Sequence, residues 1–404
     1  MPAATRPRLL FISPTYPDTQ GNGLAMRAAM FIEALAHDYQ VSLLVVPCFG
    51  PRTASAAAFI EAHCTEACVV EPRNETRWWP LPHRRRDTTP PLLRLFEHHV
   101  TRAAAALGPA EFEVIHAFRL YTAPLALGLA ARRSSFQRPR LHLDLDDIES
   151  ATHARLAALC SRNGRTTEAS IEAREATHYR EAERQLLPAF ERIYTCSEAD
   201  LARIPADVRG AVHVVPNAIR LPDTPHLRLT TRPFTFLFVG TLSYYPNEDA
   251  ASYFCTEVLP IIRRRAGRPF LVRIVGPGLP PALAACAHIP EVRLVGEVAD
   301  VGLEYAEASA VVVPIRGGGG TRIKVLEAFA YQRPVVSTAL GIEGIAAASG
   351  RDFLLGDTAE EIAAQCLKLM ADADLAAALV SHARALIEER YTQDRINRLV
   401  GSLA

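Results

Sequence analysis

Short runs of apolar residues alternate along the chain with longer amphipathic or alanine-rich stretches. Strands of a parallel sheet are buried on both faces and read as such runs, whereas the crossover helices between them have one polar face. The pattern therefore predicts an α/β fold with doubly wound parallel sheets. A first series of predicted strands comprises 8–13, 41–46, 66–71, 112–118, 140–145, 192–197 and 211–216. A second series comprises 234–240, 270–276, 292–296, 310–315 and 334–338.

The proline-containing segment 217–234 separates the two series and shows neither helical nor strand periodicity. With 404 residues the chain is too long for one ordinary core. We predict an N-terminal Rossmann-like domain of residues 1–222, a C-terminal Rossmann-like domain of residues 223–385, and a C-terminal helix, 386–404, that can cross back to the N-terminal domain. Such sheets bind ligands at the carboxyl ends of their strands, so we expect the two domains to face a central cleft.

Composition excludes several classes of function. The chain has 44 basic and 44 acidic side chains, and a net charge of zero gives no overall field for binding nucleic acid. The apolar run at the N-terminus is too short for a signal peptide or a membrane span, so we expect a cytoplasmic protein. Eight cysteines are scattered along the sequence, and the close pair Cys64 and Cys68 has no second pair to complete a zinc site.

The stretch "RGGGGTRIKVLEAFA" joins a predicted strand to a predicted helix. Glycines allow a close approach of the backbone, and the N-terminus of the following helix favours an anion. Lys324 and Glu327 share one face of that helix, and Arg322 lies just before it. The loop is not a Walker-type phosphate loop, because Thr321 stands where that motif has lysine. A tight turn with a surface Lys–Glu pair is the alternative.

A second glycine pair, Gly21 and Gly23 in "GNGLAM", matches two of the three glycines of the dinucleotide fingerprint. Two glycines are shared by many tight turns. This match alone therefore does not identify a dinucleotide site.

Residues 311–345 resemble the nucleotide-sugar motif of retaining glycosyltransferases with the GT-B fold (glycosyltransferase family 4-like, group 1), in the branch that reads G-T-R-x-K-x-x-E-A. "SPTYPDTQGNGLAMRAAMFIEALA" resembles the first glycine loop and helix of that family, and "VVPNAI" the end of its first domain. "FVGTLSYYPNEDAASYF" resembles the start of its second domain, and "VGEVADVGLEYAEASAVVVP" its base-binding region. The resemblance covers both predicted domains.

The resemblance implies that Glu327 accepts hydrogen bonds from the donor ribose. Many members have a second glutamate on the donor sugar, but Gly319 occupies that position here, so we expect backbone N–H groups of the loop to replace it. Many members also carry an Arg and a Lys in the first loop of the second domain, where this chain has Thr241 and no lysine. We infer that Arg322 and Lys324 supply the charge for the diphosphate and act in catalysis. The other expected donor-binding residues are Gly21, Gly23, Gly240, Thr241, Val298, Gly318, Gly319, Gly320 and Thr321.

On the N-terminal side, the resemblance places His116 near the donor sugar as a candidate catalytic residue, and Phe118 stands at the more usual catalytic position. A structural histidine at the end of a buried strand is the alternative. Arg119, Asp144, Asp146 and Asp147 are candidates for binding the acceptor. The three aspartates also resemble a D-x-D metal motif or a helix-capping cluster, but the GT-B resemblance implies catalysis without a metal or other cofactor.

Two adjacent tryptophans, Trp78 and Trp79, precede the basic run of Arg84, Arg85 and Arg86. Such a segment can seat a protein peripherally at the anionic inner face of a membrane, line the acceptor cleft, or form a solvated loop.

The resemblance implies transfer of a sugar from a nucleoside diphosphate sugar to an acceptor, with retention of configuration. The acceptor class stays open among glycans, lipid-linked molecules, small molecules and proteins. A nucleotide-sugar epimerase on the same fold and a non-catalytic sugar-nucleotide-binding relative are the alternatives.

Overall fold

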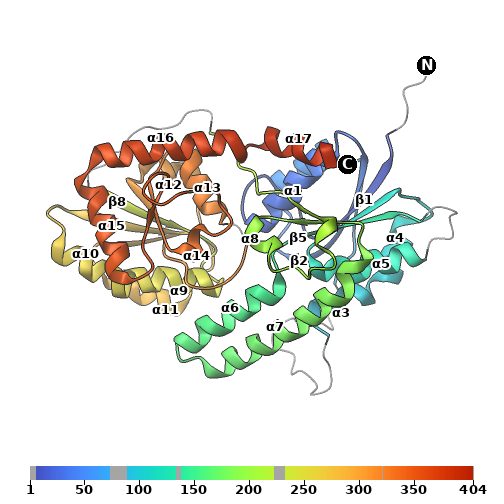
Figure 1. Cartoon of the computed structure of the whole chain (residues 1–404), viewed down its shortest axis with the longest axis horizontal. Coiled ribbons are helices and arrows are strands. Elements are labelled where there is room, and N and C mark those ends of the chain that lie inside the picture. Colours follow the sequence, from blue (N-terminus) through green and yellow to red (C-terminus); the bar gives the residue numbers. More distant parts are fainter. Residues whose placement is uncertain (1–5, 73–88, 133–137, 223–232, 321, 404) are drawn as a thin grey trace. The chain divides into compact units, whose positions relative to one another are not determined.

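The computed structural model describes residues 6–72, 89–132, 138–222, 233–320 and 322–403 (Figure 1). The chain forms two compact units, of which the first combines Met1–Ala218 with Asp394–Ala404 and the second is Ile219–Gln393. The division falls at the start of the proline-containing segment 217–234, which separates the two series of predicted strands.

The first unit is built on a parallel seven-stranded sheet with the order β3-β2-β1-β4-β5-β6-β7. Its strands are β1 (Arg8–Thr15), β2 (Gln40–Phe49), β3 (Glu66–Val69), β4 (Val114–Phe118), β5 (Arg140–Asp146), β6 (Arg192–Thr195) and β7 (Val212–Val214). Its α-helices are α1 (Gly23–Leu35), α2 (Ala54–His63), α3 (Pro91–His98), α4 (Val100–Leu107), α5 (Ala123–Ala131), α6 (Glu149–Arg162), α7 (Thr166–Leu186) and α8 (Glu198–Leu201), together with α17 (Gln393–Leu403) at the end of the chain. Short 3-10 turns are η1 (Leu120–Thr122), η2 (Leu187–Ala189) and η3 (Arg209–Ala211).

The second unit has a parallel six-stranded sheet with the order β10-β9-β8-β11-β12-β13. Its strands are β8 (Phe234–Val239), β9 (Phe270–Val275), β10 (Val292–Gly296), β11 (Ala310–Val313), β12 (Val335–Ser337) and β13 (Leu354–Leu355). Its α-helices are α9 (Tyr245–Tyr253), α10 (Leu259–Arg265), α11 (Pro281–Ala284), α12 (Val301–Glu307), α13 (Ile323–Ala330), α14 (Ala339–Ile342), α15 (Ala359–Ala371) and α16 (Ala373–Arg390). The π-helical turn η4 (Phe254–Val258) joins α9 to α10, and the 3-10 turn η5 (Ala285–His288) follows α11.

The prediction of two parallel-sheet α/β domains is confirmed, and every predicted strand is present. The strand β13 was not predicted, because two residues are too few to produce a recognisable apolar run. The continuous apolar runs have a simple cause. Along β1, Leu10 and Ile12 pack into a core on one face of the sheet, while Leu9 and Phe11 pack into a core on the other face.

The last helix, α17, belongs to the first unit. Its buried residues Ile396 and Val400 pack into the same core as Leu9 and Phe11 of β1. The chain therefore leaves the first unit after Ala218 and returns to it at its C-terminus.

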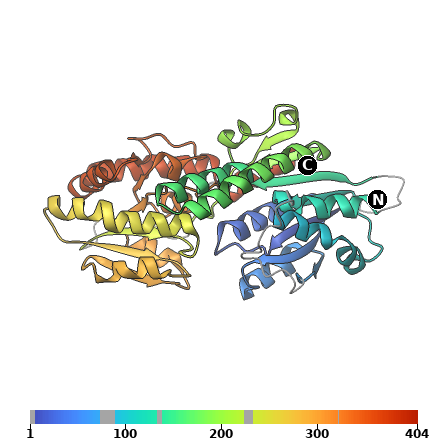
Figure 2. The ribbon, with the colours of Figure 1, turned by 90° about the horizontal axis from the view of Figure 1, so that it is seen from below.

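Helices α6 and α7 lie side by side as a helical hairpin after β5 (Figures 1 and 2). Glu183 on α7 accepts hydrogen bonds from the backbone nitrogen of Ser150, at 2.9 Å, and from its hydroxyl, at 2.6 Å. Burial raises the pKa of Glu183 to about 7. The hairpin thus buries an acidic side chain at its base, where Glu149 begins α6.

Strand order reverses at one point in each sheet. In the first sheet the reversal lies between β1 and β4, and in the second between β8 and β11. Loops that leave neighbouring strands at a reversal run in opposite directions and leave a crevice between them, where open α/β sheets bind ligands. The loops after β8 and β11 carry the predicted donor residues.

His116 was predicted as a catalytic residue, and its burial contradicts that role. The side chain is fully buried in β4, and its ring stacks between Phe11, at 4.8 Å, and Tyr194, at 5.6 Å. Neither ring nitrogen has a hydrogen-bond partner among the residues that the structure describes. Burial lowers the pKa of His116 well below its ordinary value, and the neighbouring His142 acts in the same direction. A neutral ring without access to a ligand is a core residue.

The variant His116→Phe should fold and should be more stable than the parent. Below about pH 6.5 the unfolded chain binds a proton here that the folded chain excludes, so the parent loses stability as the pH falls. Phenylalanine has no buried nitrogens that lack hydrogen bonds, which should stabilise the fold by about 1–2 kcal/mol at pH 7.5. It also cannot take up a proton on unfolding, so the destabilisation at low pH disappears. Differential scanning calorimetry at pH 7.5 and pH 5.5 should show a gain that is larger at the lower pH. A folded variant that had lost catalytic turnover would return His116 to the active site.

Candidate functional site

The loops after β8 and β9, next to the reversal point of the second sheet, are in direct contact. A Cβ atom built on Gly276, which follows β9, would lie 1.8 Å from the carbonyl oxygen of Gly240, which follows β8. A Cβ atom on Gly240 would in turn lie 2.7 Å from Nζ of Lys324. A side chain cannot fit at Gly276 against that carbonyl, and one at Gly240 would displace the end of Lys324, so the backbone after β8 forms one wall of the space in which Lys324 lies.

The glycine loop between β11 and α13 requires its glycines. Gly318 has φ +84° and Gly320 has φ +76°, a region that other residues rarely adopt, and a Cβ atom on Gly318 would lie 2.9 Å from the hydroxyl of Tyr244. Arg322 holds the loop from within, because Nη1 donates to the carbonyl of Gly319 at 2.6 Å and Nη2 to that of Gly317 at 3.3 Å. Arg322 therefore shapes the loop, and its predicted contact with a diphosphate stays a prediction. Thr321 lies outside the described residues.

Lys324, on the helix that follows the glycine loop, is linked through Asn247 to the loop after β8. Its Nζ donates to Oδ1 of Asn247 at 2.7 Å and lies 4.6 Å from the ring centroid of Phe238. Asn247 donates in turn to the carbonyl of Thr241 at 3.0 Å. Burial, together with the nearby charge of Arg322, lowers the pKa of Lys324 to about 7, while Glu327 opposes this fall. The ammonium group is thus poorly solvated and would gain from an anion beside it.

Glu327 lies one helical turn beyond Lys324 on α13. Its Oε2 accepts a hydrogen bond of 2.8 Å from the hydroxyl of the fully buried Tyr305 on α12. Burial raises the pKa of Glu327, while the hydrogen bond from Tyr305 and the charge of Lys324 oppose this rise. Val298 lies in the loop that leads into α12. The helix that carries Tyr305 therefore links the predicted base-binding loop to the predicted ribose-binding carboxylate.

Arg316 was not recognised in the sequence. It opens the glycine loop, and its guanidinium forms two hydrogen bonds with the carboxylate of Asp249, at 2.9 Å and 2.6 Å. The same guanidinium lies 4.0 Å from the ring centroid of Tyr253. Both partners are on α9, so Arg316 fastens the start of the glycine loop to that helix. An arginine directly after a buried strand was the available signal.

At the carboxyl ends of β4 and β5 in the first sheet, the predicted residues Arg119 and Asp146 do come together. Arg119 donates to Asp146 at 2.8 Å and to Glu149 at 2.6 Å. Both Arg119 (φ +74°) and Asp146 (φ +56°) have a positive φ, which non-glycine residues adopt at a cost of about 1–3 kcal/mol each. Burial raises the pKa of the neighbouring Asp147 to about 6, while Arg119 opposes the rise. These side chains form a polar group at the carboxyl ends of β4 and β5.

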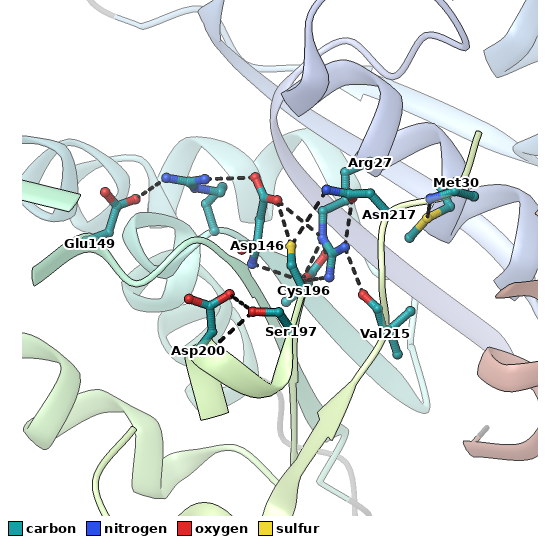
Figure 3. Close-up of polar contacts among 12 residues, drawn as sticks. Arg27, Met30, Asp146, Glu149, Cys196, Ser197, Asp200, Val215 and Asn217 are labelled. Carbon is teal, nitrogen blue, oxygen red and sulfur yellow. Dashed lines mark hydrogen bonds and ion pairs between the residues drawn. The ribbon is translucent and has the colours of Figure 1, made fainter. Parts of the chain in front are cut away.

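Asp144 was predicted to face the acceptor, and its burial contradicts that role. Its carboxylate is fully buried and accepts hydrogen bonds from Nε and Nη2 of Arg27, the shortest two both 2.8 Å. Nη1 of Arg27 donates to Val215 O at 3.0 Å and to Oδ1 of Asn217 at 2.9 Å (Figure 3). The ion pair joins α1 to β5 and to the end of the first unit. A lone arginine in the apolar stretch "GLAMRAAMFIEAL" was the signal for it.

The N-terminal glycine pair shapes the start of α1. Gly21 has φ +96°, Gly23 is the first residue of the helix, and Asn22 between them accepts a hydrogen bond from Ala25 N at 2.9 Å as the N-cap. The loop between β1 and α1 therefore contains a backbone conformation, at Gly21, that glycine adopts readily and other residues rarely adopt.

The described part of the chain contains no group of three or more His, Cys, Asp or Glu side chains arranged to hold a metal ion. In the same ranges, no helix has the length and apolar character needed to span a membrane. The segment with Trp78, Trp79, Arg84, Arg85 and Arg86 lies outside the described residues.

Residues 233–372, which include the whole glycine loop, match the family model described as Glycosyl transferases group 1. This match lies within the second unit. No curated protein matches the sequence significantly. Both units together are similar to solved structures of glycosyltransferases, which confirms the GT-B fold expected from the resemblance.

Three solved structures illustrate the similarity of fold. Sucrose-phosphate synthase from Thermosynechococcus elongatus has 15% identity and a TM-score of 0.69, with 98% of each chain covered. HepE from Anabaena, in complex with UDP and glucose, has 15% identity and a TM-score of 0.67, with 98% of this chain and 99% of HepE covered. A glycosyltransferase from Rickettsia africae has 9% identity and a TM-score of 0.64, with 99% of this chain and 98% of that one covered.

Binding of UDP at pH 8 should be accompanied by uptake of about one proton at Lys324. With a pKa of about 7, Lys324 is mostly neutral at pH 8 in the free protein, and a diphosphate beside it restores its charge. Titration calorimetry in buffers of different ionisation enthalpy measures this uptake. Lys324→Met should abolish it and weaken UDP binding by about ten- to a hundredfold.

The matched control is Lys368→Met, which removes an exposed lysine on α15 and should leave both quantities unchanged. Binding of UDP to the parent at pH 8 without proton uptake would contradict a role for Lys324 at the diphosphate.

Proposed function

We propose that this glycosyltransferase transfers a sugar from a nucleoside diphosphate sugar, with UDP as the nucleotide, to an acceptor, with retention of configuration and without a metal ion. The observation that carries the proposal is the convergence of the glycine loop, Lys324 and Glu327 at the reversal point of a group 1 glycosyltransferase domain. The structures of Anabaena HepE in complex with UDP and with UDP-glucose support UDP as the nucleotide.

The chemistry fits the loop. When the bond between sugar and diphosphate breaks, negative charge grows on the leaving diphosphate. Lys324 and the first N–H groups of α13 offer positive charge to that anion, and the glycines allow the backbone to approach it. Because these groups are held in place before the reaction, they need little rearrangement as the charge develops.

The donor sugar would meet backbone rather than a carboxylate, since Gly319 replaces the glutamate expected there. The carbonyl of Gly319 is already bonded to Arg322, which keeps the peptide that follows in one orientation. The N–H groups of this loop are therefore the proposed contacts for sugar hydroxyls.

On the acceptor side, we propose the polar group of Arg119, Asp146, Asp147 and Glu149. The pKa of about 6 for Asp147 keeps it able to exchange a proton near neutral pH. Arg119 holds Asp146 and Glu149 in fixed positions. Such a group suits an acceptor that presents hydroxyl groups.

The transferase proposal is tested by supplying UDP-glucose and related UDP-sugars with a cell extract as a source of acceptor. Release of UDP that depends on the extract supports transfer. Conversion of the donor sugar without extract would instead indicate an epimerase, and binding of UDP without any turnover would indicate a non-catalytic relative. Proton NMR of the glycosylated product then distinguishes retention from inversion.

Turnover should be unchanged in 5 mM EDTA. Lys324 and the N-terminus of α13 would supply the positive charge that a divalent cation supplies in metal-dependent transferases. Turnover is measured as UDP release with and without the chelator. Loss of activity in EDTA and its return with Mn²⁺ would assign a metal-binding role to Asp146 and Asp147.

A further inference from the structure

Tyr305 is the side chain that holds the carboxylate of Glu327. It is fully buried on α12, and its hydroxyl lies 2.8 Å from Oε2 of Glu327 and 3.3 Å from the backbone carbonyl of Lys324. Burial raises the pKa of Tyr305 well above its ordinary value, and the adjacent Glu327 acts in the same direction. The hydroxyl therefore stays protonated and remains a donor throughout the neutral pH range.

The position of Tyr305 is fixed by its neighbours. Its ring stacks on Tyr331, which follows α13, with ring centroids 5.1 Å apart and planes 6° from parallel. Gly302 on α12 makes room for this second ring, because a Cβ atom there would lie 2.5 Å from the hydroxyl of Tyr331. Tyr305 thus approaches Glu327 from a rigid stack and not from a mobile surface.

Glu327 must be ionised to accept hydrogen bonds through both oxygens, since a protonated carboxyl group uses one oxygen as a donor. Its burial favours the neutral form. Three groups face it: Lys324 on its own helix, Tyr305 on α12 and Tyr331 beyond the end of α13. Of these, Tyr305 donates a hydrogen bond directly to the carboxylate.

We infer that Tyr305 is a positioning residue that keeps Glu327 ionised and oriented, with Oε2 occupied by the tyrosine and Oε1 directed to a ribose hydroxyl of the donor nucleotide. This inference rests on the proposed function, because it assumes that Glu327 binds the ribose. It assigns a part in nucleotide recognition to a residue of α12 that acts on the ligand through the carboxylate of Glu327.

The test compares the parent with Tyr305→Phe, and with Tyr331→Phe as the matched control, which removes the hydroxyl of the other ring of the stack. The dissociation constant of UDP is measured by titration calorimetry from pH 5 to pH 8. Without the tyrosine hydroxyl, Glu327 takes up a proton at a higher pH. The acid side of the binding profile should therefore move up by about one pH unit in Tyr305→Phe, with about tenfold weaker binding at pH 6.

Tyr331→Phe should keep the parent's pH profile of UDP binding. UDP itself titrates identically in every experiment, so a difference in profile between variants comes from the protein. In the Glu327→Gln background, Tyr305→Phe should cause no shift of the profile, since the titrating group is absent. Thermal unfolding should show that Tyr305→Phe is folded over the same pH range.

Two outcomes would overturn parts of this account, and they differ. If the parent does not bind UDP, the proposed function with this nucleotide fails. If the parent binds UDP and Tyr305→Phe has the same pH profile, or if the shift persists in the Glu327→Gln background, only the role of Tyr305 fails.

Discussion

The close contact of backbones between the loops after β8 and β9, beside the reversal point of the second sheet, is the constraint on which the candidate donor site depends. Gly276 lies against the carbonyl of Gly240, and Gly240 leaves room for Nζ of Lys324. A side chain on either glycine would push the loop after β8 away from the loop after β9 or displace the lysine. The bond from Lys324 to Asn247 and the bond from Asn247 to the backbone of Thr241 form only because this space exists.

Buried ion pairs hold the loops of both units. In the second unit, Arg316 fastens the glycine loop to Asp249, whose side chain is 3% exposed. In the first unit, Arg27 and Asp144 are both fully buried and join α1 to β5. Removing one partner of such a pair leaves an uncompensated charge in the interior, at a typical cost of about 3–5 kcal/mol. An apolar pair of similar size could give the fold a similar free energy of unfolding. The main effect of these ion pairs is therefore to fix the positions of the segments that they join.

Apolar runs were sufficient to predict the two sheets, because strands buried on both faces consist mainly of apolar residues. The place of the glycine loop between a strand and a helix, with Lys324 and Glu327 on that helix, could also be predicted from the glycine run. The roles of these residues in donor binding stay predictions. The sequence could not distinguish Asp144 from Asp146. Their positions in β5 differ by one pleat repeat. Arg27, on another element, lies near both carboxylates but pairs more closely with the fully buried Asp144. The predicted catalytic role of His116 was wrong for a similar reason, because the rings that enclose it come from β1 and β6, which are distant in the sequence.

The central claim is that the glycine loop and Lys324 bind the diphosphate of a nucleotide whose ribose lies against Glu327. A crystal structure of the full chain with UDP tests it most directly. We predict phosphate oxygens within about 3 Å of Nζ of Lys324 and of N–H groups in the glycine loop, with a ribose hydroxyl at hydrogen-bond distance from the Glu327 carboxylate. UDP bound at another edge of the sheet, with Lys324 still bonded to Asn247 and no ligand at Glu327, would contradict the account.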